Sequence, residues 1–295
     1  MPLVKTTAII LRSRKWGDAD RIVTFYAKNL GKIRGVARGA RRQKSRFGAA
    51  LEPFTLCRLN LFEKAGDSLF RISHVDLVTS FQSLREDLDL MASAARMVNV
   101  VTAVTPDGDP DPLLFDTLEQ GLASLHQNGD PAFTALLFQI RLLGLTGFRP
   151  QTDHCAACGK THLVGDPQFS PIAGGLVCLT CAARQRVHCV ALSRGSLSFL
   201  QQAIRLAPAL VTRLRATGRV RSEVEEAIDE YVTVVAGKRL PPVDFLSPAL
   251  RGTGSARLSS PKSGIAGLRR APLDRLGLRS FDPEALDGRA QSSRA

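Results

Sequence analysis

The chain has 295 residues, 44% of them hydrophobic, which is enough for two domains that each bury a core. Its formal charge of +13 lies mostly at the two ends: residues 1–84 hold 16 basic and 6 acidic side chains, and residues 247–295 hold 9 and 4. No run of about 18 apolar residues and no cleavable signal is evident. We therefore expect a cytoplasmic protein with no membrane partner.

The first 80 residues alternate between apolar and polar positions, as short strands do. Five strands are expected, at residues 3–14, 20–27, 31–40, 54–64 and 68–81, with a hairpin turn at "AGDS", residues 65–68. Four glycines mark the third strand and its exit, where a curved strand must bend: Gly31, Gly35, Gly39 and Gly48. Five strands of this length match the OB-fold, a small barrel that binds single-stranded nucleic acid.

One segment of this region is strongly basic. Between Arg21 and Leu51 the sequence contains no Asp or Glu, although ordinary surfaces mix both signs. The basic side chains of residues 31–48 are Lys32, Arg34, Arg38, Arg41, Arg42, Lys44 and Arg46. This pattern predicts a surface that binds an anion such as the phosphate backbone of a nucleic acid, the simpler alternative being a solvated basic face.

From residue 81 the apolar spacing changes to three and four residues, which predicts helices. The first carries Leu84, Leu88, Met91, Ala95 and Val98, and "PDGDPDP", residues 106–112, ends it. We interpret that stretch as a solvated helix breaker, because it lacks the spacing of a calcium loop.

Four further helical segments are expected along the chain. They cover residues 112–126, residues 133–148, a segment from about 192, and residues 222–237. The second of these is apolar on almost every side. In the last, Ser222 and Glu225 are expected to form a capping box at the start of the helix. Residues 251–295 lack periodicity and are expected to be a disordered basic tail. The fold class is therefore α+β, with an OB-fold barrel at 1–80 and a helical domain at 81–250 that carries a cysteine-containing module at 150–190.

Four cysteines give the most specific chemical signal. Cys155, Cys158, Cys178 and Cys181 follow the pattern C-x2-C-x19-C-x2-C of a zinc ribbon. Four thiolates leave no open coordination position, so one structural Zn²⁺ per chain is expected. Two alternatives are four unrelated buried cysteines and a redox CxxC motif.

Other possible ligand or reactive residues receive simpler interpretations. His154 and His162 flank the cysteines but are not needed as ligands, His188 and Cys189 are expected to be packing or surface residues, and Cys57 is expected to be a core residue. The motifs GxxxxGK[ST] and GxSxG and a deaminase H-x-E are absent. The sequence thus predicts a protein that is not an enzyme.

Three stretches resemble one known family. "RIVTFYAKNLGKIRGVARGARR" at 21–42, "GARRQKSRFGAALEPF" at 39–54 and "FSPIAGGLVCLTC" at 169–181 are similar to segments of the bacterial recombination mediator family RecO. The resemblance extends in order from about residue 3 to 246 and ends before the tail.

The resemblance implies a role in DNA recombination and the repair of DNA damage. Members of this family bind single- and double-stranded DNA, anneal complementary strands without ATP, and work with RecR to load RecA onto DNA coated with single-strand binding protein. A pocket for the acidic tail of that protein is implied in the helical domain. The implied DNA contacts are Arg34, Arg38, Arg41, Arg42, Lys44 and Arg46. Two alternatives stay open: an RNA-binding or ribosome-associated protein, and an enzyme without a recognisable motif.

Overall fold

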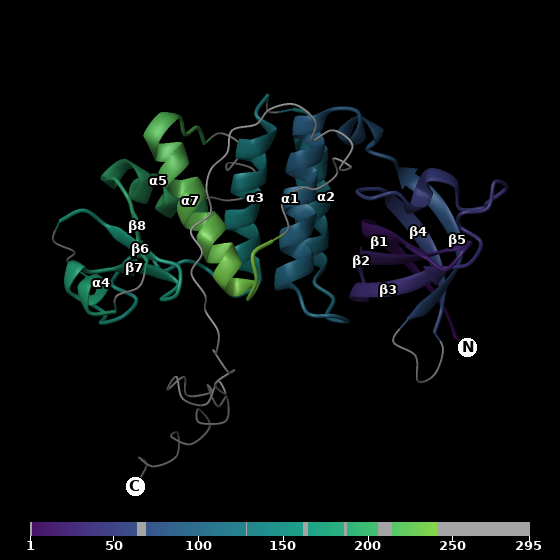
Figure 1. Cartoon of the computed structure of the whole chain (residues 1–295), viewed down its shortest axis with the longest axis horizontal. Coiled ribbons are helices and arrows are strands. Elements are labelled where there is room, and N and C mark those ends of the chain that lie inside the picture. The colour runs from purple at the N-terminus through teal and green to yellow at the C-terminus, as the bar shows by residue number, and fades with distance from the viewer. Residues whose placement is uncertain are drawn as a thin grey trace, which may run out of the picture. The chain divides into compact units, whose positions relative to one another are not determined.

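The computed structural model describes residues 2–63, 69–127, 129–161, 165–185, 188–205 and 214–240 (Figure 1). The expected turn at 65–68, His162 and the expected tail at 251–295 lie outside these residues. Among the described helices, none combines the length and the hydropathy needed to cross a lipid bilayer.

The N-terminal region is a five-stranded closed barrel, which confirms the predicted OB-fold. The strands follow one another around the barrel in the order β1-β2-β3-β5-β4. Antiparallel pairing of β1 with β4 and short parallel pairing of β3 with β5 close the sheet. The strands are β1 (Leu3–Trp16), β2 (Asp20–Ala27), β3 (Gly31–Ala37), β4 (Leu56–Phe62) and β5 (Phe70–Thr79).

The interior of the barrel forms because alternate strand residues are apolar. Phe25, Leu59 and Ile72 are almost fully buried in a core that is separate from that of the helices. The closing contact of the barrel requires glycine, since a Cβ atom at Gly35 would lie 2.9 Å from the Ile72 side chain. Cys57 also lies in this core, as predicted, and burial raises its pKa to about 12.

Among the residues that the structure describes, the helical region contains α3 and four other main helices. They are α1 (Leu88–Val104), α2 (Pro112–Ser124), α3 (Pro131–Leu145), α5 (Arg194–Arg205) and α7 (Gly218–Val235). Ten residues of α3 are buried, as its apolar sequence predicts. In Figure 1, α3 lies between α1 and α7.

Two predicted helix starts are wrong. The first helix begins at Leu88, because the Asp87 side chain caps it by accepting hydrogen bonds from two backbone N–H groups, and Leu84 lies in a preceding 3-10 turn. The predicted capping box at Ser222 does not form, because α7 starts at Gly218 and the Ser222 hydroxyl donates to the Arg219 carbonyl. Glu225 instead pairs with Arg96 at 2.7 Å.

In the chain, the cysteine module follows α3 and precedes α5. It consists of a three-stranded sheet in the order β7-β6-β8 and one short helix: β6 (Gln168–Ser170), β7 (Gly175–Val177), α4 (Leu179–Gln185) and β8 (Val190–Ala191). Phe169 of β6 meets Tyr231 of α7 edge to face, with ring centroids 5.8 Å apart. The module thus shares one hydrophobic core with the helices.

The loop at 106–112 ends α1, as predicted, but it also packs against the barrel. Lys32 of β3, whose side chain is 12% exposed, donates to the carbonyls of Thr102 and Thr105 at 2.8 and 2.5 Å. Asp107 lies 3.2 Å from the same ammonium group, and Gly108 N–H donates to the Lys32 carbonyl. The neutralisation of part of the basic segment by this acidic loop was not predicted, because it depends on contacts between distant residues.

Candidate nucleic-acid interface and metal centre

The basic segment leaves β3 as a folded loop that is anchored in the barrel. Phe47 and Leu51 are buried in the barrel core at the far end of the loop. The Arg46 guanidinium lies over the Phe47 ring, 5.1 Å from its centroid. Backbone hydrogen bonds from Arg42 to Gly39 and from Ser45 to Arg42 form successive turns in between. The cationic side chains are therefore displayed from a fixed scaffold.

The loop is also joined to the turn between β1 and β2. Arg41 donates from Nη1 to the carbonyls of Gly17 and Asp18 at 3.2 and 3.0 Å, and its backbone N–H donates to Ala19. The Asp20 carboxylate accepts from Gly39 N–H at 2.8 Å. Arg41 thus has a structural role in addition to the predicted contact with DNA.

The other predicted DNA-contacting side chains differ in whether an acidic residue lies near them. Within the described ranges, the side chains of Arg38, Arg42 and Lys44 are exposed and form no ion pair or hydrogen bond. Arg34 is exposed on β3, where the Asp107 carboxylate lies 3.9 Å away. Arg38, Arg42 and Lys44 are consequently the cations most available to a phosphate group.

The strand register extends this surface onto the outside of the barrel. Arg12 of β1 pairs with Thr24 of β2, and Thr24 pairs with Arg34 of β3, so the three form one row across the sheet. Directly paired residues point to the same face. By strand alternation, Arg14 and Trp16 follow Arg12 on that face, toward the basic loop.

Sequence reasoning missed this part of the surface. Arg14 and Trp16 are exposed, whereas Arg12 is half-buried and donates to Asn99 Oδ1 at 2.8 Å. Burial lowers the pKa of Arg12, and the charge of Arg14 lowers it further. The four consecutive polar residues of the "RSRK" stretch, 12–15, could have indicated that this end of the strand is exposed to solvent, but the alignment of Arg12 with Arg34 depends on the register.

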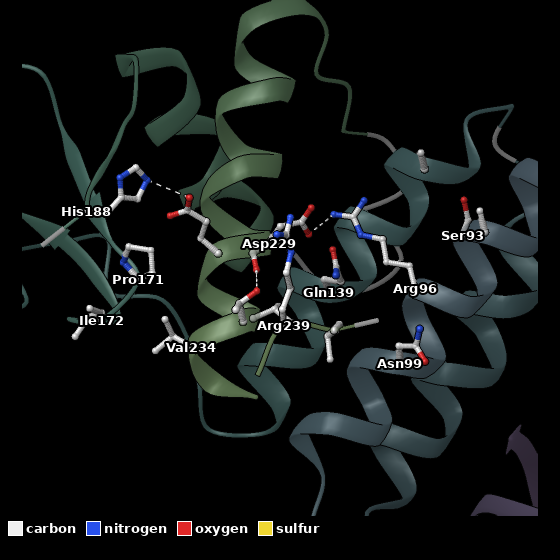
Figure 2. A pocket seen from close by; sticks show the side chains of 16 residues that line it. Ser93, Arg96, Asn99, Gln139, Pro171, Ile172, His188, Asp229, Val234 and Arg239 are labelled. Atoms are coloured by element: carbon white, nitrogen blue, oxygen red, sulfur yellow. Dashed lines mark hydrogen bonds and ion pairs between the residues drawn. The ribbon is translucent and has the colours of Figure 1, made fainter. Parts of the chain in front are cut away.

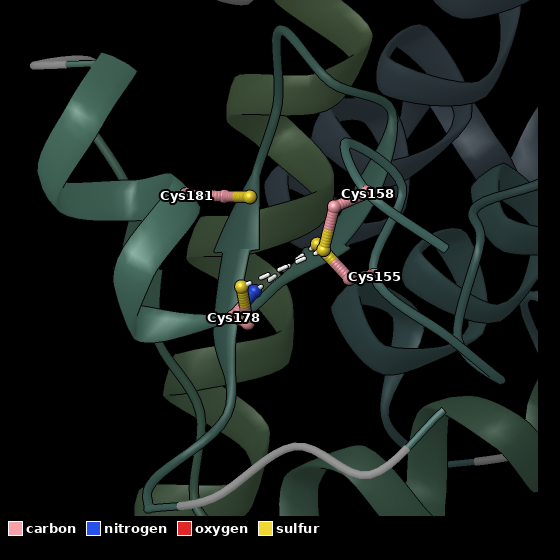
Figure 3. Close-up of side chains that lie close together, drawn as sticks. All are labelled: Cys155, Cys158, Cys178 and Cys181. Carbon is pink, nitrogen blue, oxygen red and sulfur yellow. Dashed lines mark hydrogen bonds between the residues drawn. The ribbon is translucent and has the colours of Figure 1, made fainter. Parts of the chain in front are cut away.

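The four predicted cysteines come together. Figure 3 shows Cys155 and Cys158 in one loop facing Cys178, which follows β7, and Cys181 in α4. All four Sγ atoms lie within 4.8 Å of one another, and those of Cys158 and Cys178 are 3.8 Å apart. A tetrahedral ion with metal–sulfur distances of about 2.3 Å requires sulfur atoms about 3.8 Å apart, so the cluster fits a metal.

The backbone around the cysteines is arranged to stabilise thiolates. Burial raises the pKa of Cys155, but backbone N–H groups of Cys178, Ala157 and Cys158 lower it to about 6 overall. The Cys178 N–H lies 3.3 Å from the Cys155 sulfur. The first loop also joins β7 through a hydrogen bond of 2.7 Å from Ala156 N–H to the Leu176 carbonyl. Within the described ranges, His154 is not one of this group.

A second site lies in the helical region. A pocket of about 740 Å³ opens between α1, α3 and α7 and is lined on one side by Pro171 and Ile172 (Figure 2). Gln139 is 1% exposed, and its Oε1 atom has no hydrogen-bond partner among the described residues. Arg96 binds Asp229 at 2.5 Å. Burial is the main factor that raises the pKa of Asp229, and Arg96 opposes it.

A histidine lies at the edge of this pocket. His188, predicted as a packing or surface residue, is exposed and lies 3.0 Å from Glu230 (Figure 2). Glu226 is the third residue of this small group. The exposed Arg239 also lines the pocket and forms no ion pair within the described ranges.

Comparison with known proteins gives a consistent result. Two family models match, "Recombination protein O N terminal" at residues 1–81 and "Recombination protein O C terminal" at residues 85–242. The "DNA repair protein RecO" of Symbiobacterium thermophilum is 33% identical over 252 residues, covering 83% of this chain and 97% of that protein. Its counterpart in Myxococcus xanthus is 34% identical over 244 residues, covering 81% of this chain and 95% of that protein.

These matches cover both the barrel and the helical region with its cysteine module, and they agree with the resemblance found in the sequence. The chain therefore belongs to the RecO family of DNA repair proteins.

Proposed function

We propose that this protein is a DNA-binding recombination mediator that binds single- and double-stranded DNA and anneals complementary strands without ATP. The observation that carries this proposal is the folded basic loop. Its exposed cations Arg38, Arg42 and Lys44 have no acidic partner among the described residues. Arg34, Arg41 and Arg46 complete the proposed contacts with DNA. Each of these three also contacts another part of the barrel or its loops.

Contact with phosphate groups explains how such a protein can accept any sequence. Cations bound to phosphates release counterions, which gives affinity independent of base sequence. One strand neutralised in this way repels a second strand less, so complementary bases can meet and pair. This step involves no bond breaking, and we propose that the protein is not an enzyme.

Mediation requires further partners, and we propose RecR, single-strand binding protein and, indirectly, RecA. The pocket between α1, α3 and α7 is our candidate for the acidic tail of single-strand binding protein. Its apolar residues Pro171 and Ile172 suit an apolar side chain of a bound peptide. Because Arg96 is already held by Glu225 and Asp229, Arg239 is, among the described lining residues, the arginine available to an acidic residue.

We propose that the cysteine cluster holds one structural Zn²⁺ on Cys155, Cys158, Cys178 and Cys181. Four thiolates are a ligand set that zinc favours, and they leave no coordination position for a substrate. Bound zinc would supply a fixed link between the first loop and α4. The residues of the module would then keep Phe169 packed against Tyr231 of α7.

We further propose a division into a DNA-binding barrel at 1–80, a helical domain at 81–250 with the zinc module at 150–190, and a basic tail at 251–295. The proposed place of action is the nucleoid in the cytoplasm. The tail would add affinity for DNA that is independent of sequence, since it carries more basic than acidic side chains.

The test is an annealing assay with complementary DNA strands coated with single-strand binding protein, without ATP. We expect the protein to accelerate annealing. A protein that anneals only RNA strands would instead support the alternative, an RNA-binding or ribosome-associated function, because the charge of the loop suits either nucleic acid.

A further inference from the structure

Trp16 occupies an unusual position for a tryptophan. It is the single Trp of the chain, it ends β1, and it is 56% exposed. Tryptophan is the largest apolar side chain, and most of its surface is normally buried in a folded protein. Its exposure leaves a flat aromatic surface in contact with solvent.

The surroundings of Trp16 are those of the proposed DNA site. Its direct partner across the strands is Asp20, whose carboxylate accepts from Gly39 N–H of the basic loop. The next two residues of the turn, Gly17 and Asp18, are held by Arg41. Trp16 is therefore fixed where the basic loop meets the basic outer face of the barrel.

Neighbouring side chains offer cations for the phosphates on either side of a base. Arg14 and Lys15 precede Trp16 and are exposed, and Arg12 and Arg34 continue the same face one row further on. Asp18 is the exposed acidic residue of the turn. A surface that places an exposed aromatic side chain among cations suits a nucleic-acid strand whose bases are unpaired.

We propose that Trp16 stacks on an unpaired base and so gives this surface a preference for single strands over duplexes. The inference rests on the proposed binding of DNA and adds the chemical form of DNA that the site selects. A base in a duplex is already stacked on both faces, so it offers no free face to Trp16. Phosphate contacts alone do not distinguish the two forms in this way.

The experiment compares three ligands of equal length: a single strand with bases, an abasic single strand, and a duplex. Because Trp16 is the only tryptophan, its intrinsic fluorescence reports directly on stacking. We expect the strand with bases to quench this fluorescence, and the abasic strand and the duplex to leave it nearly unchanged at saturation. Binding is measured separately by anisotropy of labelled DNA.

Substitution provides the second measurement. Trp16→Ala should weaken binding of the strand with bases about tenfold, which corresponds to about 1.4 kcal/mol, and leave binding of the abasic strand unchanged. Trp16→Phe should recover part of the loss. The slope of log affinity against log salt should stay the same in both variants, because no phosphate contact is removed. Leu77→Ala on β5, which removes another exposed apolar side chain, is the control for general surface effects.

The outcomes are distinct. Equal loss of affinity for strands with and without bases, or unchanged fluorescence with bound DNA, would overturn the stacking role while leaving DNA binding intact. Absence of binding to all three ligands would overturn the proposed function itself. Because Trp16 is exposed, we expect the variants to keep the wild-type melting temperature. An unchanged melting temperature would show that a loss of DNA affinity arises in the folded protein.

Discussion

The guanidinium of Arg41 donates a hydrogen bond of 3.0 Å to the carbonyl oxygen of Asp18, and this contact joins the basic loop to the turn between β1 and β2. A second bond from the same nitrogen reaches Gly17. Arg41, which we propose as a DNA contact, thus also stabilises the folded loop. Variants of this loop must therefore be chosen with both roles in mind.

Arg41→Ala should lower stability as well as DNA affinity. Loss of the exposed hydrogen bonds is expected to cost about 1 kcal/mol, which corresponds to a decrease in melting temperature of about 2–4 °C. Arg42→Ala, the matched control one residue away, should weaken DNA binding without changing the melting temperature. An unchanged melting temperature for Arg41→Ala would show that the turn does not depend on this contact.

Removal of the metal should affect more than the cysteine module. Zinc binding of this kind contributes on the order of 10 kcal/mol to local folding, so Cys155→Ser should lose the metal and unfold the module. Because Phe169, Leu176 and Val190 belong to the helical core, hydrogen exchange should also increase in α7. The barrel has a separate core and should stay protected. Protein purified without chelators that contains well under one zinc per chain would contradict the assignment.

Glu223 should make the helical domain sensitive to acid. Burial raises its pKa, but hydrogen bonds from Ser196, Ser193 and Arg219 lower it to about 2 overall. A carboxylate with a lowered pKa stabilises the fold above its unfolded pKa, about 4.5, and this contribution is lost as pH falls toward 2. The difference in unfolding free energy between wild type and Glu223→Gln should therefore be largest near neutral pH and shrink below pH ~4.5. A difference that is independent of pH would contradict this account.

Local patterns in the sequence were sufficient to predict the five strands of the barrel and the cysteine cluster. The five strands follow from alternation, and the clustering of the four cysteines follows from the spacing of Cys155, Cys158, Cys178 and Cys181, because each CxxC turn is a local structure. Burial of Cys57 followed from its apolar strand. These features depend on neighbours a few residues away.

Features that depend on distant segments could not be predicted. Asp107 lies 75 residues after Lys32 in sequence, and only the folded chain shows that the two are paired. The capping box at Ser222 satisfied a local rule, but α7 begins four residues earlier, at Gly218, where Val220 packs against the helical core and Arg221 pairs with Asp130. The pocket around Gln139 is formed by three helices, and the alignment of Arg12 with Arg34 requires the strand register.

The pocket assignment is tested with a peptide that has an acidic, apolar C-terminus like the proposed tail ligand. Arg239→Glu should weaken binding of this peptide about tenfold or more, because it replaces an attractive charge by a repulsive one. Arg149→Glu, an exposed arginine outside the pocket lining, makes the same change in net charge and should have little effect. Equal effects of the two variants would indicate a general electrostatic attraction and would remove the pocket from the proposal.

The final prediction concerns the salt dependence of DNA binding. Five loop contacts, from Arg38, Arg41, Arg42, Lys44 and Arg46, should give a slope of log affinity against log salt of roughly −3.5, at about −0.7 per contact with a single strand. The triple variant Arg38→Glu, Arg42→Glu, Lys44→Glu leaves two of the five contacts, so it should flatten the slope to roughly −1.4 and abolish annealing. It should stay folded and keep its zinc, because these exposed side chains form no ion pair or hydrogen bond within the described ranges.

The matched control for this variant changes three exposed arginines of the helical half to Glu: Arg149, Arg184 and Arg194. They also form no ion pair or hydrogen bond with another residue that the structure describes, so the change in net charge is the same and the expected cost in stability is similar. If the charge of the loop acts locally, the control should retain most of the slope and the annealing rate. If instead the control fails and the loop variant anneals DNA at the wild-type rate, the DNA site lies in the helical half and the basic loop serves another purpose.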